Sequence, residues 1–169
     1  LQGEVTGVLP STEWKRRTYR RPEQQRWYAG ETISLGIGQG YNNFTMLQLA
    51  NAMATLVSGG QRFEPRLARE IEDTVTGERR KVGSQEKAPL PLKPEHVALI
   101  KDAMYGVTQE GTSTRVFLGA PYQTGGKTGT AQAVGVRQNA KYDAAKLEEH
   151  LRNHSLYIAF APLQEPTIV

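Results

Sequence analysis

Residues 125–132 read Gly-Gly-Lys-Thr-Gly-Thr-Ala-Gln, and this run limits the possible folds of the chain more than any other segment. Glycine has no Cβ atom, so a strand that contains several glycines lets another backbone approach closely. Lys127 adds a cationic donor, and Thr128 and Thr130 add hydroxyl groups. The run therefore indicates a strand that faces an anionic, peptide-like ligand.

A phosphate-binding loop is the first alternative for this run. That motif needs a glycine, four residues, and then Gly-Lys-Ser/Thr at the start of a helix. Here Pro121 holds the position of the first glycine, and Gly129 follows where the helix should begin. The spacing argues against phosphate binding. A glycine-rich turn with an incidental lysine stays open as an alternative if these eight residues are taken alone.

Further segments around the run occur in a fixed order. They are Gly-Ile-Gly-Gln-Gly-Tyr at residues 36–41, Ala-Pro-Tyr at 120–122, Leu-Arg-Asn-His at 151–154 and Ala-Phe-Ala-Pro at 159–162. Lys-Thr-Gly is itself one of three motifs, with Ser-x-x-Lys and Ser-x-Asn, of the penicillin-interacting acyl-transfer enzymes. Together the segments resemble the C-terminal part of the transpeptidase domain of class B penicillin-binding proteins, of the penicillin-binding protein 2 type. The resemblance is weakest over residues 71–91.

The resemblance implies an α+β fold of the β-lactamase-like transpeptidase type, in which antiparallel strands pack with helices. Residues 1–169 would form the C-terminal portion of one transpeptidase domain. We expect this fold to be truncated at both ends, because two of the three motifs are missing and residues 167–169 read as a strand that stops after three residues.

Two short matches to the missing motifs are interpreted as chance. Ser84 and Lys87 fit Ser-x-x-Lys, but the surrounding stretch is polar and is followed by Pro89 and Pro91, so no apolar helix can form there. Tyr-Asn-Asn at residues 41–43 imitates the Tyr-x-Asn of related hydrolases, but it belongs to the glycine-rich lead-in to a helix. The fragment is therefore predicted to lack its nucleophile and to be inactive by itself.

By this resemblance, the parent protein is a serine-type D,D-transpeptidase that cross-links peptidoglycan stem peptides and binds penicillin. Lys127 would act in catalysis and bind near the substrate carboxylate, which Thr128 and Thr130 would hydrogen-bond. Gly129 would keep the strand approachable, and the backbone N–H of Thr130 would complete an oxyanion hole. No cofactor or metal is implied.

The same resemblance implies partners and a location for the parent protein. Its partners would be the stem peptide, β-lactam antibiotics and proteins of the cell-elongation machinery. It would work at the periplasmic face of the bacterial inner membrane, held by an anchor outside this chain.

Residues 14–26 support a function from another class. The formal net charge is +4, and residues 14–21 interleave cations with aromatic side chains. This composition suits a non-catalytic binding module for a polyanion or a cell-wall partner. Pro22 and the absence of a clear period instead favour a solvated, partly ordered loop, and no nucleic-acid binding is expected. The absence of cysteine excludes disulfides and thiol catalysis.

Hydrophobic periodicity predicts the remaining elements. Residues 1–30 are predicted to be irregular. Helices are predicted from an N-cap at Thr45 to residue 57, and over residues 94–107, 114–118 and 143–154. A hairpin is predicted around the Thr-Gly turn at residues 76–77, and strands are predicted from 122 to 134 or 136 and over 156–161.

Two further patterns suggest cofactor or metal sites and fail on spacing. The glycines at residues 36, 38 and 40 lack the spacing of a dinucleotide fingerprint, and we expect them to pack a strand end against the helix at 45–57. His150 and His154 would lie one helical turn apart, but the glutamate and the third ligand of a zinc helix are missing. They are predicted to be solvent-facing residues at a helix end.

Overall fold

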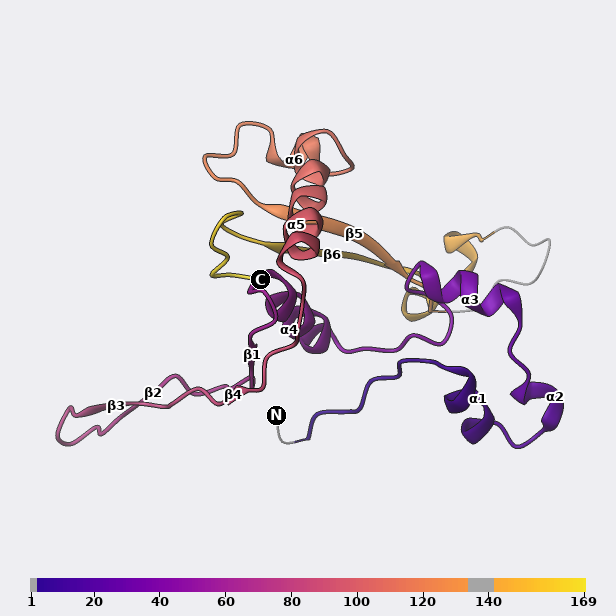
Figure 1. Cartoon of the computed structure of the whole chain (residues 1–169), viewed down its shortest axis with the longest axis horizontal. Coiled ribbons are helices and arrows are strands. Elements are labelled where there is room, and N and C mark those ends of the chain that lie inside the picture. Colours follow the sequence, from indigo (N-terminus) through magenta and orange to yellow (C-terminus); the bar gives the residue numbers. More distant parts are fainter. Residues whose placement is uncertain (1–2, 134–141) are drawn as a thin grey trace. The chain divides into compact units, whose positions relative to one another are not determined.

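The computed structural model describes residues 3–133 and 142–169 (Figure 1). The chain divides into two compact units. Unit 1 is built mainly from Leu47–Lys127 and Ile158–Val169, and unit 2 from Val5–Met46 and Thr128–Tyr157. Two strands, β5 (Gly125–Ala131) and β6 (His154–Phe160), contribute residues to both units. The mixture of helices and small antiparallel sheets confirms the predicted α+β class.

The core of unit 1 is formed by helices α4 (Met46–Val57) and α5 (Pro94–Gln109) with the start of β5 and the end of β6. Its buried members are Val57, Met104, Phe160 and Leu163, and Met53, Tyr105 and Ile158 pack against them. Both helices were predicted, as was α6 (Thr114–Phe117). Met46 is exposed in the first turn of α4.

Helix α4 ends in two consecutive glycines that adopt a Schellman motif. The N–H of Gly59 donates to the carbonyl of Leu56 at 3.1 Å, and the N–H of Gly60 donates to the carbonyl of Thr55 at 2.8 Å. Gly59 has φ +74°, in the left-handed region that favours glycine. A Cβ atom on Gly60 would lie 2.3 Å from the carbonyl oxygen of Leu90. The glycine pair therefore ends the helix, and Gly60 also leaves room for the backbone of Leu90 in the segment that precedes α5.

Two antiparallel strand pairs connect α4 to α5. The strands are β1 (Arg62–Phe63), which pairs with β4 (Glu86–Lys87), and β2 (Glu70–Glu72), which pairs with β3 (Arg79–Lys81). The predicted hairpin is confirmed. Its turn is fixed by Asp73, whose carboxylate accepts hydrogen bonds from the N–H groups of Thr76 at 3.0 Å and Val75 at 2.8 Å. These bonds hold the pKa of Asp73 below its ordinary value.

Unit 2 begins with three helices, α1 (Thr12–Thr18), α2 (Pro22–Gln25) and α3 (Ala29–Gly36). The prediction that residues 1–30 are irregular holds for residues 3–11 but was wrong from residue 12 onward, where α1, α2 and the start of α3 lie, and the predicted solvated loop at residues 14–21 was wrong over residues 14–18. These errors arise from Lys15, whose charge predicts a solvent-exposed side chain. Only 3% of its side chain is exposed, so α1 buries its most polar residue instead of an apolar face.

The Lys15 ammonium group has a complete set of partners inside unit 2. It donates to the backbone carbonyl of Arg26 at 2.7 Å and forms an ion pair with Glu31. It also lies 5.2 to 5.9 Å from the ring centroids of three aromatic side chains, within the range of cation–π attraction. These rings belong to Trp27, Tyr28 and Tyr41. We call these six residues the Lys15 cage.

Glu31 is the anionic member of the Lys15 cage. Burial raises the pKa of Glu31, but hydrogen bonds from Lys15, from the Tyr28 N–H at 2.9 Å and from the Tyr41 hydroxyl at 3.1 Å outweigh that effect, so its pKa lies below the ordinary value. Burial is the main cause of a raised pKa for Tyr41, to which Tyr19 and Glu31 add. Tyr41 therefore stays protonated and donates to the carboxylate.

Helix α3 ends in a second Schellman motif, where the sequence reading expected a strand end. The N–H of Gly38 donates to the carbonyl of Leu35 at 3.0 Å, and the N–H of Gln39 donates to that of Ser34 at 2.9 Å. Gly38 has φ +75° and Gly40 has φ +70°. The glycine spacing thus serves to end a helix and to turn the chain back toward the Lys15 cage.

The helix predicted over residues 143–154 is also absent. Two short 3₁₀ helices, Ala144–Lys146 and Glu149–Leu151, occupy this segment, and β6 begins at His154. Leu147 and Glu148 are extended between them, and the carbonyl of Leu147 accepts from the Arg152 guanidinium at 3.1 Å. A side chain thus bonds a carbonyl that a continuous helix would have bonded through its backbone.

Among the residues that the structure describes, no helix has the length and apolar character needed to cross a bilayer. The predicted end of the motif strand at residue 134 or 136 lies outside the described residues.

We predict that Lys15→Ala will lower the free energy of unfolding by about 3–5 kcal/mol, because the buried ammonium group is lost and the partly buried Glu31 is left without its counter-ion. Urea unfolding monitored by tryptophan fluorescence measures the change, since Trp14 and Trp27 are both in unit 2. Arg16→Ala is the matched control, because Arg16 is the exposed neighbour on the same helix. Equal effects of the two substitutions would contradict the role of the Lys15 cage.

The lowered pKa of Glu31 predicts an acid-sensitive contribution to stability. A carboxylate with a depressed folded-state pKa contributes stability at pH values above its unfolded pKa, and this contribution is lost as the pH falls through the folded-state value. The difference in unfolding free energy between the wild type and Glu31→Gln should therefore be largest above about pH 5 and should shrink below about pH 4. A difference that is constant from pH 7 to pH 3 would show that the Glu31 charge does not contribute.

Candidate active site

Strand β5 carries the motif of residues 125–132, and its two halves have different surroundings. Gly125 and Gly126 are buried, whereas Lys127, Thr128 and Thr130 are exposed. The strand was predicted to begin near Tyr122 and begins at Gly125 instead. The buried first half fixes the strand in unit 1, and the exposed second half presents the polar side chains.

Buried hydroxyl groups fix the entry to β5. The Thr124 hydroxyl donates to the carbonyl of Phe160 at 2.6 Å, and the Thr108 hydroxyl donates to the carbonyl of Thr124 at 3.0 Å. Thr108 is 2% exposed and Thr124 is 4% exposed, so both bonds are shielded from water. They connect α5, β5 and the end of β6 directly in front of the motif.

Gly125 is required by the close approach of Phe160. A Cβ atom on Gly125 would lie 2.5 Å from Cζ of that ring and 3.2 Å from Cβ of Met104. The ring of Phe160 is 1% exposed and belongs to the core of unit 1. The first glycine of the motif is therefore a packing position, where no larger side chain fits.

Strands β5 and β6 run antiparallel. Gly125 lies against Phe160, and four residues later Gly129 lies against Leu156, with 3.6 Å between the Leu156 Cβ and the position of a Gly129 Cβ. In the described part of the chain, β6 is the sheet partner of β5, and no third strand pairs with β5. An extended ligand can therefore approach β5 at the edge away from β6.

A contact within unit 2 holds the far end of the motif. The amide of Gln39 donates to the backbone carbonyl of Thr130 at 3.3 Å. Gln39 is in turn fixed by its place in the Schellman motif that ends α3. The sequence reading did not identify Gln39, Thr108 or Thr124 as contributors to the site. The glycines on either side of Gln39 were the only available signal, and they were interpreted as a strand-to-helix turn.

The strand gives this site a definite chemical character. The exposed Lys127 ammonium can attract an anion, and the hydroxyls of Thr128 and Thr130 can each donate or accept a hydrogen bond. Gly129 lets a ligand backbone approach the strand between the two threonines. An extended peptide with a carboxylate matches these groups better than a compact apolar ligand does.

The short sequence matches are not part of this site. Ser84 lies in an exposed segment before β4, and Lys87 forms an ion pair with Glu64 at 3.7 Å, so the two do not share a helix. Tyr41 is bound to Glu31, and the Asn42 amide donates to the carbonyl of Gln39 at 3.0 Å. Neither match therefore lies on a helix of the kind that the first motif requires or on the motif strand residues Lys127–Thr130.

The two histidines also lie in separate elements. His150 is in the second 3₁₀ helix and His154 begins β6, so the prediction that they share a helix end was wrong. Within the described residues, no three His, Cys, Asp or Glu side chains gather in a way that could hold a metal ion.

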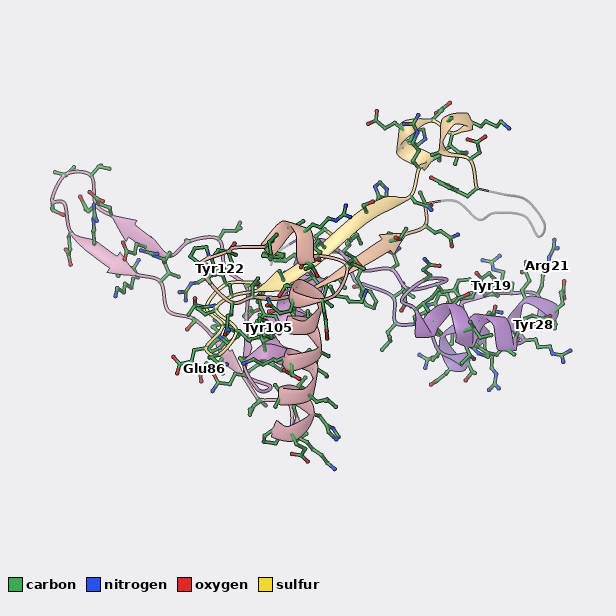
Figure 2. The ribbon with its side chains drawn as sticks, turned by 90° about the horizontal axis from the view of Figure 1, so that it is seen from above. Tyr19, Arg21, Tyr28, Glu86, Tyr105 and Tyr122 are labelled. Carbon is green, nitrogen blue, oxygen red and sulfur yellow. The ribbon has the colours of Figure 1, made fainter. Side chains whose placement is uncertain are left out.

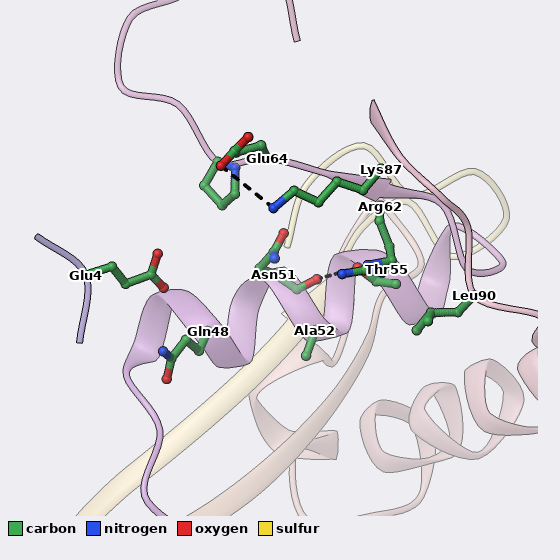
Figure 3. Close-up of a pocket in the computed structure, with 10 residues that line it drawn as sticks. Glu4, Gln48, Asn51, Ala52, Thr55, Arg62, Glu64, Lys87 and Leu90 are labelled. Atoms are coloured by element: carbon green, nitrogen blue, oxygen red, sulfur yellow. Dashed lines mark hydrogen bonds and ion pairs between the residues drawn. The ribbon is translucent and has the colours of Figure 1, made fainter. Parts of the chain in front are cut away.

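Two cavities of unit 1 are candidates for a binding site besides the motif strand. One of about 370 Å³ at the entry to β5 is lined by Tyr105 and Tyr122, which Figure 2 labels, and by Thr124. Another of about 470 Å³ lies between the polar side of α4 and strands β1 and β4, and Figure 3 shows the Glu64–Lys87 ion pair at its rim. Neither cavity is lined by Lys127, Thr128 or Thr130. The candidate site is therefore the exposed strand itself.

The whole chain, residues 1–169, matches the family profile described as the penicillin-binding protein transpeptidase domain. The chain belongs to the penicillin-binding transpeptidase family. It is 37% identical over 173 residues to the peptidoglycan D,D-transpeptidase MrdA of Escherichia coli K12, and 36% identical over 177 residues to that of Haemophilus influenzae. These matches cover 99% and 100% of the chain and 26% of each relative. This chain of the transpeptidase family thus spans about a quarter of the length of these relatives.

Solved structures agree with this assignment of the transpeptidase chain. Penicillin-binding protein 2 of Pseudomonas aeruginosa, solved in complex with WCK 5153, matches with a TM-score of 0.69 and 32% identity, over 98% of the chain and 32% of that structure. Penicillin-binding protein 2B of Streptococcus pneumoniae matches with a TM-score of 0.67 and 23% identity, over 99% of the chain and 24% of that structure, which supports the fold alone.

The packing of β5 predicts that two alanine substitutions in the transpeptidase motif will lower stability by different amounts. Gly125→Ala should destabilise the protein by about 1–3 kcal/mol, because the added methyl group meets the Phe160 ring. Gly129→Ala should cost less than about 1 kcal/mol, because its methyl group would make an ordinary contact with Leu156. Thermal unfolding of the two variants measures the difference. Equal losses would show that Gly125 is not a packing position.

Proposed function

We propose that strand β5 is one wall of the active site of a peptidoglycan D,D-transpeptidase. The observation that supports this most directly is the exposed Lys127–Thr130 segment at the edge of β5 away from β6, in a chain of the transpeptidase family. The substrate is an extended stem peptide that lies along this edge, as in the addition of a strand to a sheet. Penicillin and other β-lactams occupy the same position.

The reaction we propose is a serine-type acyl transfer. A serine hydroxyl attacks the carbonyl carbon of the penultimate D-alanine, the terminal D-alanine leaves with its amine protonated, and the acyl group passes to an amine of a neighbouring strand. We place the serine outside residues 1–169, because Ser84 is the only serine in the sequence with a lysine three residues later and it lies in an exposed segment outside any helix. The 169-residue chain alone is therefore inactive.

Each residue of the wall has a separate role in this proposal. Lys127 raises the local positive potential and binds near the substrate carboxylate. The hydroxyls of Thr128 and Thr130 hydrogen-bond that carboxylate, and Gly129 lets the peptide backbone approach. The N–H of Thr130 donates to the oxyanion that forms during acylation, an interaction worth about 2.7–4 kcal/mol in comparable sites.

The proposal places the intact protein in cell-wall synthesis at the periplasmic face of the inner membrane. Its relatives are named as peptidoglycan transpeptidases, and one structural neighbour at 32% identity is titled as a peptidoglycan synthase complex that coordinates polymerisation and crosslinking. By analogy, the intact protein works with other proteins of the elongation machinery.

The alternative function, a polyanion-binding module at residues 14–26, has less support. Lys15 faces the interior of unit 2, and Arg17 forms an ion pair with Glu13. Two of the cations that suggested the module are thus occupied within the protein. Salt-dependent binding of a polyanion, with a steep decline in log affinity against log salt, would favour this alternative.

We predict that Lys127→Ala in the intact protein will slow acylation by a labelled penicillin about 10²–10³-fold and leave the fold unchanged. Single-turnover labelling kinetics measure the rate, and circular dichroism checks the fold. Lys146→Ala is the matched control, because the Lys146 side chain is 82% exposed and forms a surface ion pair with the nearby Asp143 at 3.3 Å. Unchanged kinetics for Lys127→Ala would remove this lysine from the mechanism.

The isolated 169-residue chain should show no covalent labelling by the same penicillin. Mass spectrometry after incubation detects an acyl adduct directly. A stable adduct on any serine of this chain would refute the proposal that the nucleophile lies elsewhere.

A further inference from the structure

The hairpin formed by β2 and β3 is an arm with no packing partner in unit 1. We define the arm as residues 66–82. In Figure 1 it extends from the β1–β4 pair away from α4 and α5, and β2 and β3 make their only element contacts with each other among the described residues. Every residue from 66 to 81 is exposed. An isolated two-stranded hairpin is only marginally stable in water, so this arm gains from a further strand.

The register of the arm determines which backbone groups are available. The N–H of Val82 donates to the carbonyl of Arg69, and the N–H of Asp73 donates to that of Glu78, both at 2.9 Å. Antiparallel pairs alternate between hydrogen-bonded and non-hydrogen-bonded positions, so the intervening Arg79 and Lys81 direct their N–H and C=O groups away from β2. The outer edge of β3 is therefore a regular set of donors and acceptors.

The charges of the arm differ between its two strands. β2 reads Glu-Ile-Glu and β3 reads Arg-Arg-Lys. On one face, Glu72 and Arg79 form an ion pair at 2.9 Å, and Glu70 lies opposite Lys81. On the other face, Arg80 lies opposite Ile71, and its guanidinium makes no ion pair with any described residue. At its inner edge, β3 thus pairs with a strand in which acidic residues alternate with an apolar residue.

We propose that the outer edge of β3 binds an extended segment of a partner protein in which acidic and apolar residues alternate. The segment adds a third strand to the arm through the outward backbone groups of Arg79 and Lys81. Its carboxylate lies beside Arg80, and the apolar residues before and after it lie on the opposite face, beside the aliphatic stems of Arg79 and Lys81. The acidic β2 edge repels the same segment, so binding is specific for β3. This inference does not depend on the proposed catalytic function.

The test uses the intact protein and two synthetic probe peptides with blocked ends. One probe alternates glutamate and valine, and the control probe alternates lysine and valine. Fluorescence anisotropy should show saturable binding of the glutamate probe and no binding of the lysine probe. Equal binding of both probes, or binding of neither, would overturn the proposal.

Substitutions in β3 locate the binding edge. Lys81→Pro removes one outward N–H and should abolish binding, whereas Lys81→Ala removes only the charge and should weaken binding about two- to threefold. Arg80→Glu should weaken binding at least about tenfold, and Arg66→Glu, which makes the same charge change outside the strands, should have no effect. Equal affinities of Lys81→Pro and Lys81→Ala would contradict strand addition at this edge.

Two further outcomes would assign the edge to a different occupant. Hydrogen exchange on the intact protein without peptide should find the amides of Arg79 and Lys81 unprotected. Protection at both would mean that the protein's own polypeptide covers the edge, and it would overturn the proposal. Sedimentation that shows a dimer in the wild type and a monomer in Lys81→Pro would assign the edge to a second copy of the chain, which also overturns it.

Discussion

The buried Lys15 ammonium group is the interaction on which unit 2 depends. A cation with 3% side-chain exposure is tolerated only because a carboxylate, a backbone carbonyl and three aromatic rings replace the water it has lost. Lys15 itself lies in α1, and its partners come from the segment between α2 and α3, from α3 and from the chain after α3. No single helix of this unit is long enough to be stable alone, so the ammonium group is the point at which they are joined.

The Lys15 cage also reaches the motif strand through a short series of contacts. Tyr41 binds Glu31 in the cage, and the Schellman motif that ends α3 fixes the turn immediately before Tyr41. Gln39 projects from that turn and binds the Thr130 carbonyl. The basic, aromatic residues near the N-terminal end of the chain thus have a structural role in supporting the motif. Their charge alone suggested a binding surface, but the most deeply buried of them binds within the protein.

The sequence predicted the elements of unit 1 and missed most of unit 2, and the reason lies in the source of stability. Helices α4 and α5 are stabilised by apolar side chains at helical spacing, such as Val57 and Met104, which can be read from a sequence. Helix α1 is stabilised by a buried lysine, whereas a lysine in a sequence normally predicts a solvent-exposed position. The segment at residues 143–154 has good helix-forming residues, but the carbonyl of Leu147 is bonded by the Arg152 side chain, an arrangement that helix propensity does not predict.

The candidate site was predictable in its residues but not in its supports. The glycines, Lys127 and the threonines could be identified from their order, because the chemistry of the strand is local. Thr108, Thr124 and Gln39 act through contacts between segments that are 16 to 91 residues apart in sequence, and no local pattern marks them. Composition alone left open whether the chain is part of an enzyme or a binding module. The resemblance to a known family favoured the enzyme.

The contact between Gly125 and Phe160 has a consequence for how this strand can evolve. Every substitution of glycine adds at least a methyl group, and the space it needs is already filled by the phenyl ring. Position 125 can therefore change only after position 160 has become smaller, and a smaller residue at 160 first opens a void in the core of unit 1. Because each change is harmful by itself, the two positions should vary together among relatives.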